Sequence, residues 1–237
     1  RRFAEEGGTP RHDRFRAGRQ PVTGDRSPTF TAVLDGSCND PARLGGKGAA
    51  LDRLIGWGIR VPDTGVVTAD AYRAVVAQPG PARLLAEMAD EREHGADEID
   101  RFLRDTIPPA AVRSALVARG QAIASGHRLA VRSSATVEDL AHSSFAGLYR
   151  SVLDVDAEDS DALVEAVLSV FASLWHPQAR TYRSALGIDD HDVAMAVVLM
   201  RMIPAERPSK SHHFKPCQKS EHPRIEQESR IAETRET

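Results

Sequence analysis

Lysine is scarce in this sequence. Only four of its 31 basic residues are lysines, and Lys210, Lys215 and Lys219 all lie in the last 33 residues. Residues 1–204 therefore contain 23 arginines and a single lysine, Lys47. A GC-rich coding sequence produces such a bias by chance, so scarcity alone assigns no role. The glycine-rich turn around Lys47 makes this residue a candidate for binding an anion.

Three further absences limit the function classes. The two cysteines, Cys38 and Cys217, are far apart and form neither a disulfide framework nor a CxxC metal pair, which suits a reducing cytoplasm. The longest apolar run, Val193 to Met200, has 8 residues, whereas a membrane-spanning helix needs about 20. The net charge of −3 is also unlike that of a nucleic-acid-binding protein. We therefore expect a cytoplasmic protein that binds neither membranes nor nucleic acid.

What is present predicts one folded region with polar ends. The 237 residues are 41% hydrophobic, which is enough for a core. Residues 1–28 are polar and aperiodic, and we expect a disordered leader there. From residue 205 onward only six of 33 residues are apolar, which predicts a disordered tail. The first residue is Arg1 and no apolar signal follows it, so we expect either a start further upstream or a wrongly assigned first codon.

Periodicity between these ends predicts alternating helices and strands. We expect a helix after the glycine turn, one that Thr68 caps, and two or three over residues 79–128. A further helix starts with the acids of residues 156–161 and continues to about residue 174, and another covers about residues 178–185. The expected strands cover residues 29–34, 65–67, 129–132, 151–155 and 193–203. The pattern predicts an α+β domain over residues 29–204.

Three segments carry candidate chemistry. Leu44-Gly45-Gly46-Lys47-Gly48 opens a helix with close backbone approach and a point charge for a phosphate, although it lacks the P-loop spacing. Arg132 leaves an apolar strand into Ser133-Ser134-Ala135-Thr136, followed by Glu138-Asp139, and suits bidentate phosphate contact. The small residues around Gly147 suggest a mobile flap. Each has a structural alternative: an ordinary turn, an Arg–Glu pair and a surface loop.

In this order, the three segments resemble the N-terminal ATP-binding region of the phosphoenolpyruvate-utilising dikinases. These are phosphoenolpyruvate synthase, pyruvate phosphate dikinase and rifampin phosphotransferase. Ala130-Val131-Arg132-Ser133-Ser134-Ala135-Thr136 is the most specific string, and Phe171-Ala172-Ser173-Leu174-Trp175 supports it. The resemblance covers about residues 30–206.

The resemblance implies the first part of an ATP-grasp-type fold, which sandwiches ATP between two subdomains. Phosphoryl groups pass in this family from ATP to a histidine on a separate domain, and then to pyruvate or another acceptor. Carried over by motif, Lys47 and Arg132 contact the ATP phosphates. Gly147 and Ser151 belong to the flap, with Ser151 where the family usually has threonine, and Met200 stands where it typically has glutamine near the adenine.

The resemblance also implies what this chain does not carry. Mg²⁺ accompanies ATP in the family, but its acidic ligands lie in a second half with no counterpart here. We therefore expect no catalytic residue, no metal ligand and no turnover by this chain alone. The tail after residue 204 suggests a frameshifted or prematurely ended reading frame. Without the second half, we expect the strand at 193–203 to lie at an edge of the sheet and to promote aggregation.

Alternatives remain open at this point. The phosphoenolpyruvate synthase type leads, with pyruvate as acceptor, and an antibiotic kinase of the rifampin phosphotransferase type is the first alternative. The others are a non-catalytic fragment and a stand-alone ATP-binding module. The tail residues His212, His213, Cys217 and His222 match no zinc template. For His127, His142, His176 and His191 we expect surface or turn positions rather than catalytic ones.

Overall fold

The structure is a computed structural model, and it describes residues 28–38, 40–89, 96–137 and 147–203. The strands are β1 (Thr31–Val33), β2 (Thr64–Val67), β3 (Leu129–Ala135), β4 (Ser151–Val155) and β5 (Met195–Arg201). The helices are α1 (Pro41–Gly56), α2 (Ala69–Val76), α3 (Pro79–Ala89), α4 (Ala96–Arg104), α5 (Ala110–Ala124), α6 (Ser160–Ser173), α7 (Pro177–Ala185) and the short 3-10 helix η1 (Asp190–Asp192). This mixture confirms the predicted α+β class.

The five strands form one sheet in the order β1-β2-β5-β3-β4, with every neighbouring pair antiparallel. The prediction that the strand at 193–203 lies at an edge is wrong. β5 pairs with β2 on one side and along its whole length with β3 on the other. Its continuous apolar sequence suits this interior place, because both of its faces are buried. Among the described residues, the edge strands are β1 and β4.

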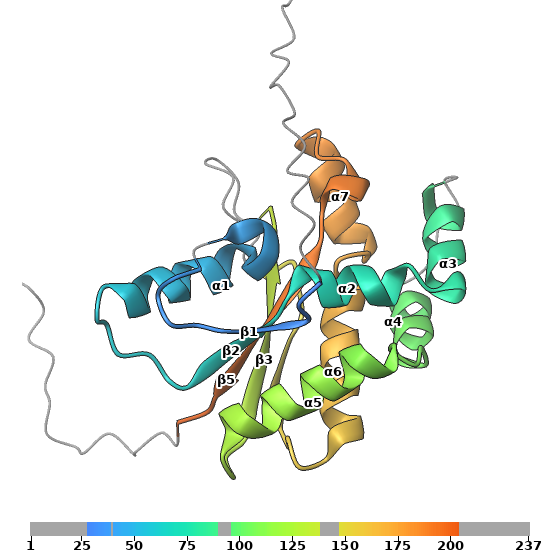
Figure 1. The fold of residues 1–237 in the computed structure, drawn as a ribbon. Coiled ribbons are helices and arrows are strands. Elements are labelled where there is room, and N and C mark those ends of the chain that lie inside the picture. The colour runs from blue at the N-terminus through green and yellow to red at the C-terminus, as the bar shows by residue number, and fades with distance from the viewer. Residues whose placement is uncertain (1–27, 39, 90–95, 138–146, 204–237) are drawn as a thin grey trace, which may run out of the picture. The chain divides into compact units, whose positions relative to one another are not determined.

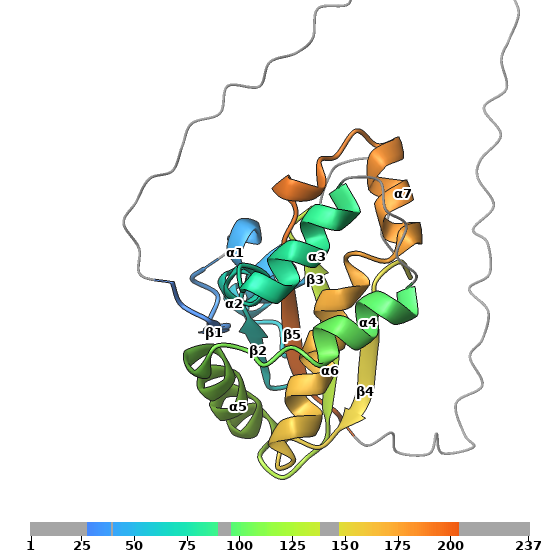
Figure 2. The same ribbon diagram turned by 90° about the vertical axis from the view of Figure 1, so that its right-hand side faces the viewer.

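Helices α2, α5 and α6 cover one face of the sheet (Figures 1 and 2). The inward side chains of the strands pack there against the apolar side chains of α6. Phe171 of α6 is 1% exposed, and its ring meets that of Tyr72 edge-on, with centroids 5.3 Å apart. Burial raises the pKa of Tyr72, and its hydroxyl accepts a hydrogen bond from Trp175 Nε1 at 2.8 Å. This face holds the larger of the two hydrophobic clusters.

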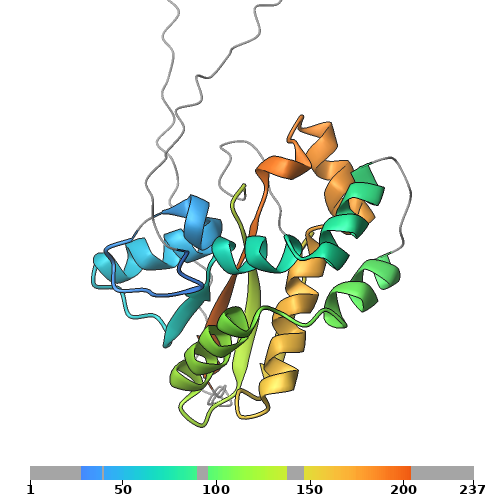
Figure 3. The ribbon, with the colours of Figure 1, turned by 45° about the vertical axis from the view of Figure 1, so that its right-hand side comes forward.

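Helix α1 covers the other face (Figure 3). A smaller cluster forms beneath it, in which Leu44 and Ala49 of α1 meet Val66 of β2 and Val198 of β5. α1 contacts β5, β3 and β2, and its contacts with β4 are too few to form a packed interface. The outer part of this face, at β3 and β4, therefore carries exposed polar side chains.

Two local predictions need correction. Thr68 precedes α2, but its hydroxyl donates to the carbonyl of Thr29 at 2.6 Å instead of capping the helix. β3 continues three residues beyond the predicted end, through Ser133, Ser134 and Ala135, because these residues pair with β5 and are buried. The strand at 151–155 matches the prediction residue for residue.

Candidate functional site

The glycine-rich turn is fitted directly onto β3. Helix α1 is interrupted at Gly45, whose φ of 70° and ψ of 172° are available to glycine and essentially to no other residue. A Cβ on Gly45 would overlap the carbonyl oxygen of Ser134. The amide of Gly48 donates to Ser134 Oγ at 3.0 Å, and that hydroxyl donates to the carbonyl of Leu44 at 2.8 Å. Ser134 therefore holds the turn from both sides of Gly45.

Lys47 lies at the first turn of the helical segment that resumes after Gly45, and its side chain is exposed. The start of a helix presents backbone N–H groups and a partial positive charge to an anion. The ammonium of Lys47 adds a full charge at the same place. Because the amide of Gly48 is bound to Ser134, the backbone around Lys47 lies beside β3.

Arg132 lies on the same side of the sheet as α1. It is directly opposite Val198, which belongs to the hydrophobic cluster under α1, and two residues from Ser134. Residues two apart on a strand share a face, at roughly 6.5 Å spacing. The Arg132 side chain is nevertheless exposed, because α1 does not extend over it. Ser134 thus connects the two segments: it bonds to Gly48, the neighbour of Lys47 in α1, and Arg132 is two residues before it in β3.

Ser151 joins this group from β4. It is the cross-strand partner of Arg132, so the two side chains lie side by side on the face of α1. Met200 of β5 lies on this face too, half-buried beside Ala130. Sequence reasoning did not assign the register that sets Ser151 against Arg132, nor the buried contacts of Ser134 with Leu44 and Gly48.

The remaining predicted features are less fully placed. Gly147 lies in an exposed turn before β4, with φ of 78°, and in the described residues no strand pairing joins it to the other three. Glu138, Asp139 and the segment 143–145 lie outside the described residues. Within the described ranges, no three histidine, cysteine or acidic side chains gather to hold a metal ion. We assign no step to Mg²⁺.

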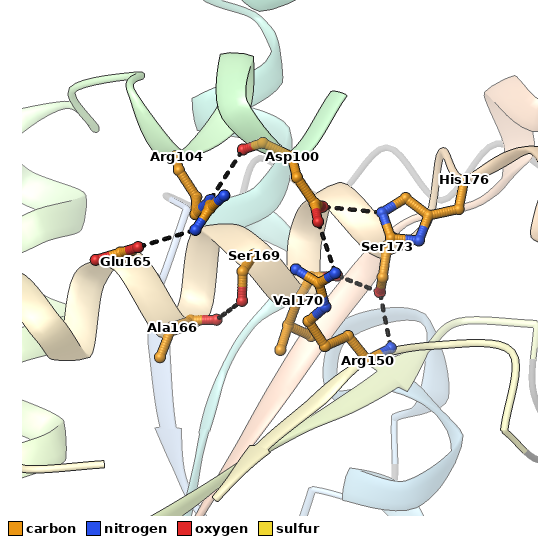
Figure 4. Close-up of polar contacts among 9 residues, drawn as sticks. All are labelled: Asp100, Arg104, Arg150, Glu165, Ala166, Ser169, Val170, Ser173 and His176. Atoms are coloured by element: carbon orange, nitrogen blue, oxygen red, sulfur yellow. Dashed lines mark hydrogen bonds and ion pairs between the residues drawn. The ribbon is translucent and has the colours of Figure 1, made fainter. Parts of the chain in front are cut away.

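A second polar cluster lies behind β4, on the side of α4 and α6 (Figure 4). Asp100 of α4, whose side chain is only 5% exposed, accepts from Arg150 Nη2 at 2.6 Å and lies 2.9 Å from His176 Nε2. His176 occupies a turn, as expected, but its ring is engaged in this cluster. Sequence reasoning missed the cluster because its members are 50 and 76 residues from Asp100 along the chain.

The fold and the positions of Lys47 and Arg132 now allow comparison with known proteins. Residues 41–211 match the family model described as the pyruvate phosphate dikinase, AMP/ATP-binding domain. The chain belongs to this family. The AMP/ATP-binding domain match includes Lys47, Arg132, Gly147 and Ser151, and it confirms the resemblance stated from the sequence.

Individual relatives of this AMP/ATP-binding domain carry several names. The chain is 38% identical over 175 residues to a phosphoenolpyruvate synthase of Aeropyrum pernix, covering 68% of this chain and 21% of that protein. It is 33% identical over 191 residues to the phosphoenolpyruvate synthase of Escherichia coli, covering 74% and 24%. It is 42% identical over 171 residues to a rifampicin phosphotransferase of Streptomyces sviceus, covering 68% and 20%. The chain spans about a fifth to a quarter of the length of these relatives. In the described part of the domain, no helix combines the length and hydropathy required to cross a bilayer.

Proposed function

We propose that this chain binds ATP through a phosphate site on the α1 face of its sheet. Lys47 and Arg132 supply the positive charge, and the N–H groups at the start of the helix after Gly45 supply hydrogen-bond donors. Ser151, opposite Arg132, contributes a hydroxyl donor, and Gly147 lies in the turn that leads to it. We infer that the domain is the first part of an ATP-grasp-type fold, which places its nucleotide between two subdomains.

One observation carries this proposal. A lysine of α1 and an arginine of β3, 85 residues apart in sequence, both lie close to Ser134: the amide of Gly48, next to Lys47, donates to Ser134 Oγ, and Arg132 is two residues before Ser134 on the face that α1 covers in part. Both side chains are exposed, so both are accessible to a ligand from solvent. A triphosphate needs several cations and N–H donors in one place, and this face offers them.

The reaction of a longer protein of this type is phosphoryl transfer from ATP, through a histidine, to pyruvate. Several relatives named phosphoenolpyruvate synthase favour this acceptor. The identity of 42% to a rifampicin phosphotransferase supports an antibiotic acceptor as the second candidate. The ATP site proposed here is common to both, since the aligned residues are those of the nucleotide-binding domain.

Titration of ATP into the purified chain, followed by calorimetry, tests the site. Losing one charged hydrogen-bond partner costs about 1.5–3 kcal/mol, so Lys47→Ala and Arg132→Ala should each weaken binding about tenfold or more. Arg132→Lys should also weaken it, because lysine lacks the planar fork. The matched control is Arg83→Ala, an exposed arginine of α3 whose Glu87 contact is 3.8 Å long. Equal affinity in the wild type and all four variants would show that the phosphates bind elsewhere.

A further inference from the structure

Asp100 connects three elements behind the proposed phosphate site. Its two carboxylate oxygens take different partners: Oδ2 accepts from Arg150, just before β4, and Oδ1 faces His176, just before α7 (Figure 4). Oδ1 lies 2.9 Å from His176 Nε2, which is within hydrogen-bond distance. Asp100 itself is almost fully buried, whereas the Arg150 side chain is 38% exposed. A buried carboxylate with two polar partners restricts the positions of both partner side chains, here Arg150 and His176.

Arg150 is held at its backbone as well as at its side chain. Its amide donates to Ser173 Oγ at 3.1 Å, and that hydroxyl donates to the carbonyl of Val170 at 2.7 Å. Ser173 is fully buried at the end of α6, within the large core. Arg150, the residue before β4, is thus bound to α4 through its guanidinium and to α6 through its main-chain amide.

The next residue is Ser151, which lies on the other face. Successive side chains of a strand point to opposite faces, so an anchor on Arg150 from the α6 side determines how Ser151 is presented on the α1 side. β4 needs such an anchor because it is an edge strand in the described residues, paired only with β3. A register shift at Asp154, where φ is 63°, further limits its pairing. The hydrogen-bonded ladder alone therefore gives β4 little rigidity.

We propose that Asp100 and Ser173 are positioning residues for the ATP site: they fix Arg150 behind the sheet and thereby hold Ser151 beside Arg132 in front of it. The ATP-affinity part of this inference rests on the proposed function. The positioning part does not, since it concerns the chain without nucleotide. None of the three residues in this anchor contacts the nucleotide itself.

Hydrogen exchange without nucleotide tests the positioning directly. Asp100→Asn keeps the shape of the side chain but removes its charge, and Arg150→Gln removes the guanidinium from the partner. Both should speed exchange of the amides of residues 150–155, about threefold to tenfold, and leave residues 195–201 unchanged. The matched control is Glu165→Gln, the same chemical change at an exposed carboxylate that bridges α6 to Arg104 of α4. Unchanged exchange at residues 150–155 in both variants overturns the inference.

Calorimetric titration of ATP tests the consequence for binding. Asp100→Asn and Arg150→Gln should each weaken ATP affinity about threefold to tenfold. Because both remove the same contact, the double variant should bind ATP as tightly as the single variant with the lower affinity. A purely structural role predicts lower thermal stability with unchanged affinity well below the melting temperature, and that result overturns the claim. Faster exchange in a chain for which neither the wild type nor Lys47→Ala binds ATP would reject the proposed function while confirming that Asp100 positions β4.

Discussion

The two faces of the sheet differ in what they bury and in what they leave exposed. Helices α2, α5 and α6 close one face over the larger hydrophobic cluster, whereas α1 closes only part of the other. Arg132 and Ser151 lie on the part that α1 leaves open, and Lys47 is an exposed residue of α1 itself. We therefore expect the closed face to determine the stability of the domain and the open part to bind the ligand. Charged groups on the open part remain in contact with solvent, so a ligand can reach them. Substitutions on the two faces should therefore have different effects.

The largest expected effect on stability comes from the closed face. Phe171→Ala removes a ring that is 1% exposed and contacts Tyr72, and it should lower the free energy of unfolding by about 4 kcal/mol. Urea unfolding followed by circular dichroism measures this. Leu186→Ala, at an exposed position after α7, is the control and should change little. A loss below about 1 kcal/mol for Phe171→Ala would mean that this face is not the main core.

A smaller but still substantial loss of stability is expected where α1 packs against β3. Gly45→Ala forces a Cβ into the carbonyl of Ser134 and a backbone conformation that alanine avoids. Together these should cost about 3 kcal/mol in the same unfolding experiment. Gly58 also has a positive φ, of 74°, but a Cβ added there would meet no atom within 4 Å. Gly58→Ala should therefore lower the free energy of unfolding by only about 1 kcal/mol. Equal losses in the two variants would indicate that α1 can shift away from β3 easily.

The smallest effect on stability is expected on the open part of that face. Arg132→Ala and Ser151→Ala should each change the free energy of unfolding by less than about 0.5 kcal/mol, because both side chains are exposed. Arg132→Ala is the same variant for which we expect weaker ATP binding. A large destabilisation by Arg132→Ala would make this arginine part of the core, and the contrast between the faces would then disappear.

Much of the fold could be predicted from local sequence, and its long-range pairing could not. The strand at residues 151–155 was predicted residue for residue, and a helix was predicted where α6 lies. The place of β5 was predicted wrongly, because an apolar run shows that a strand is buried but does not identify its neighbours. Thr68 follows the local pattern of a helix cap, yet its hydroxyl bonds to Thr29, 39 residues away.

The candidate site shows the same division. Lys47 became a candidate because it is the lone lysine of residues 1–204 and lies in a glycine-rich turn, and Arg132 because it precedes two serines at the end of an apolar run. The register that sets Ser151 opposite Arg132 depends on how β3 and β4 pair, which only the structure gives. Asp100, Arg150 and His176 have no local signature at all, because each is an ordinary charged or polar residue until the helices pack.

The central place of β5 has a consequence for how the domain forms during synthesis. Residues 195–201 are the last strand of the sheet to leave the ribosome, yet they join β2 to β3. Until they emerge, the chain contains only the β1–β2 pair and the β3–β4 pair, and isolated two-stranded pairs are marginally stable in water. The nascent chain therefore cannot complete its sheet early, and a chain that ends before Met195 would contain two strand pairs with no strand to join them.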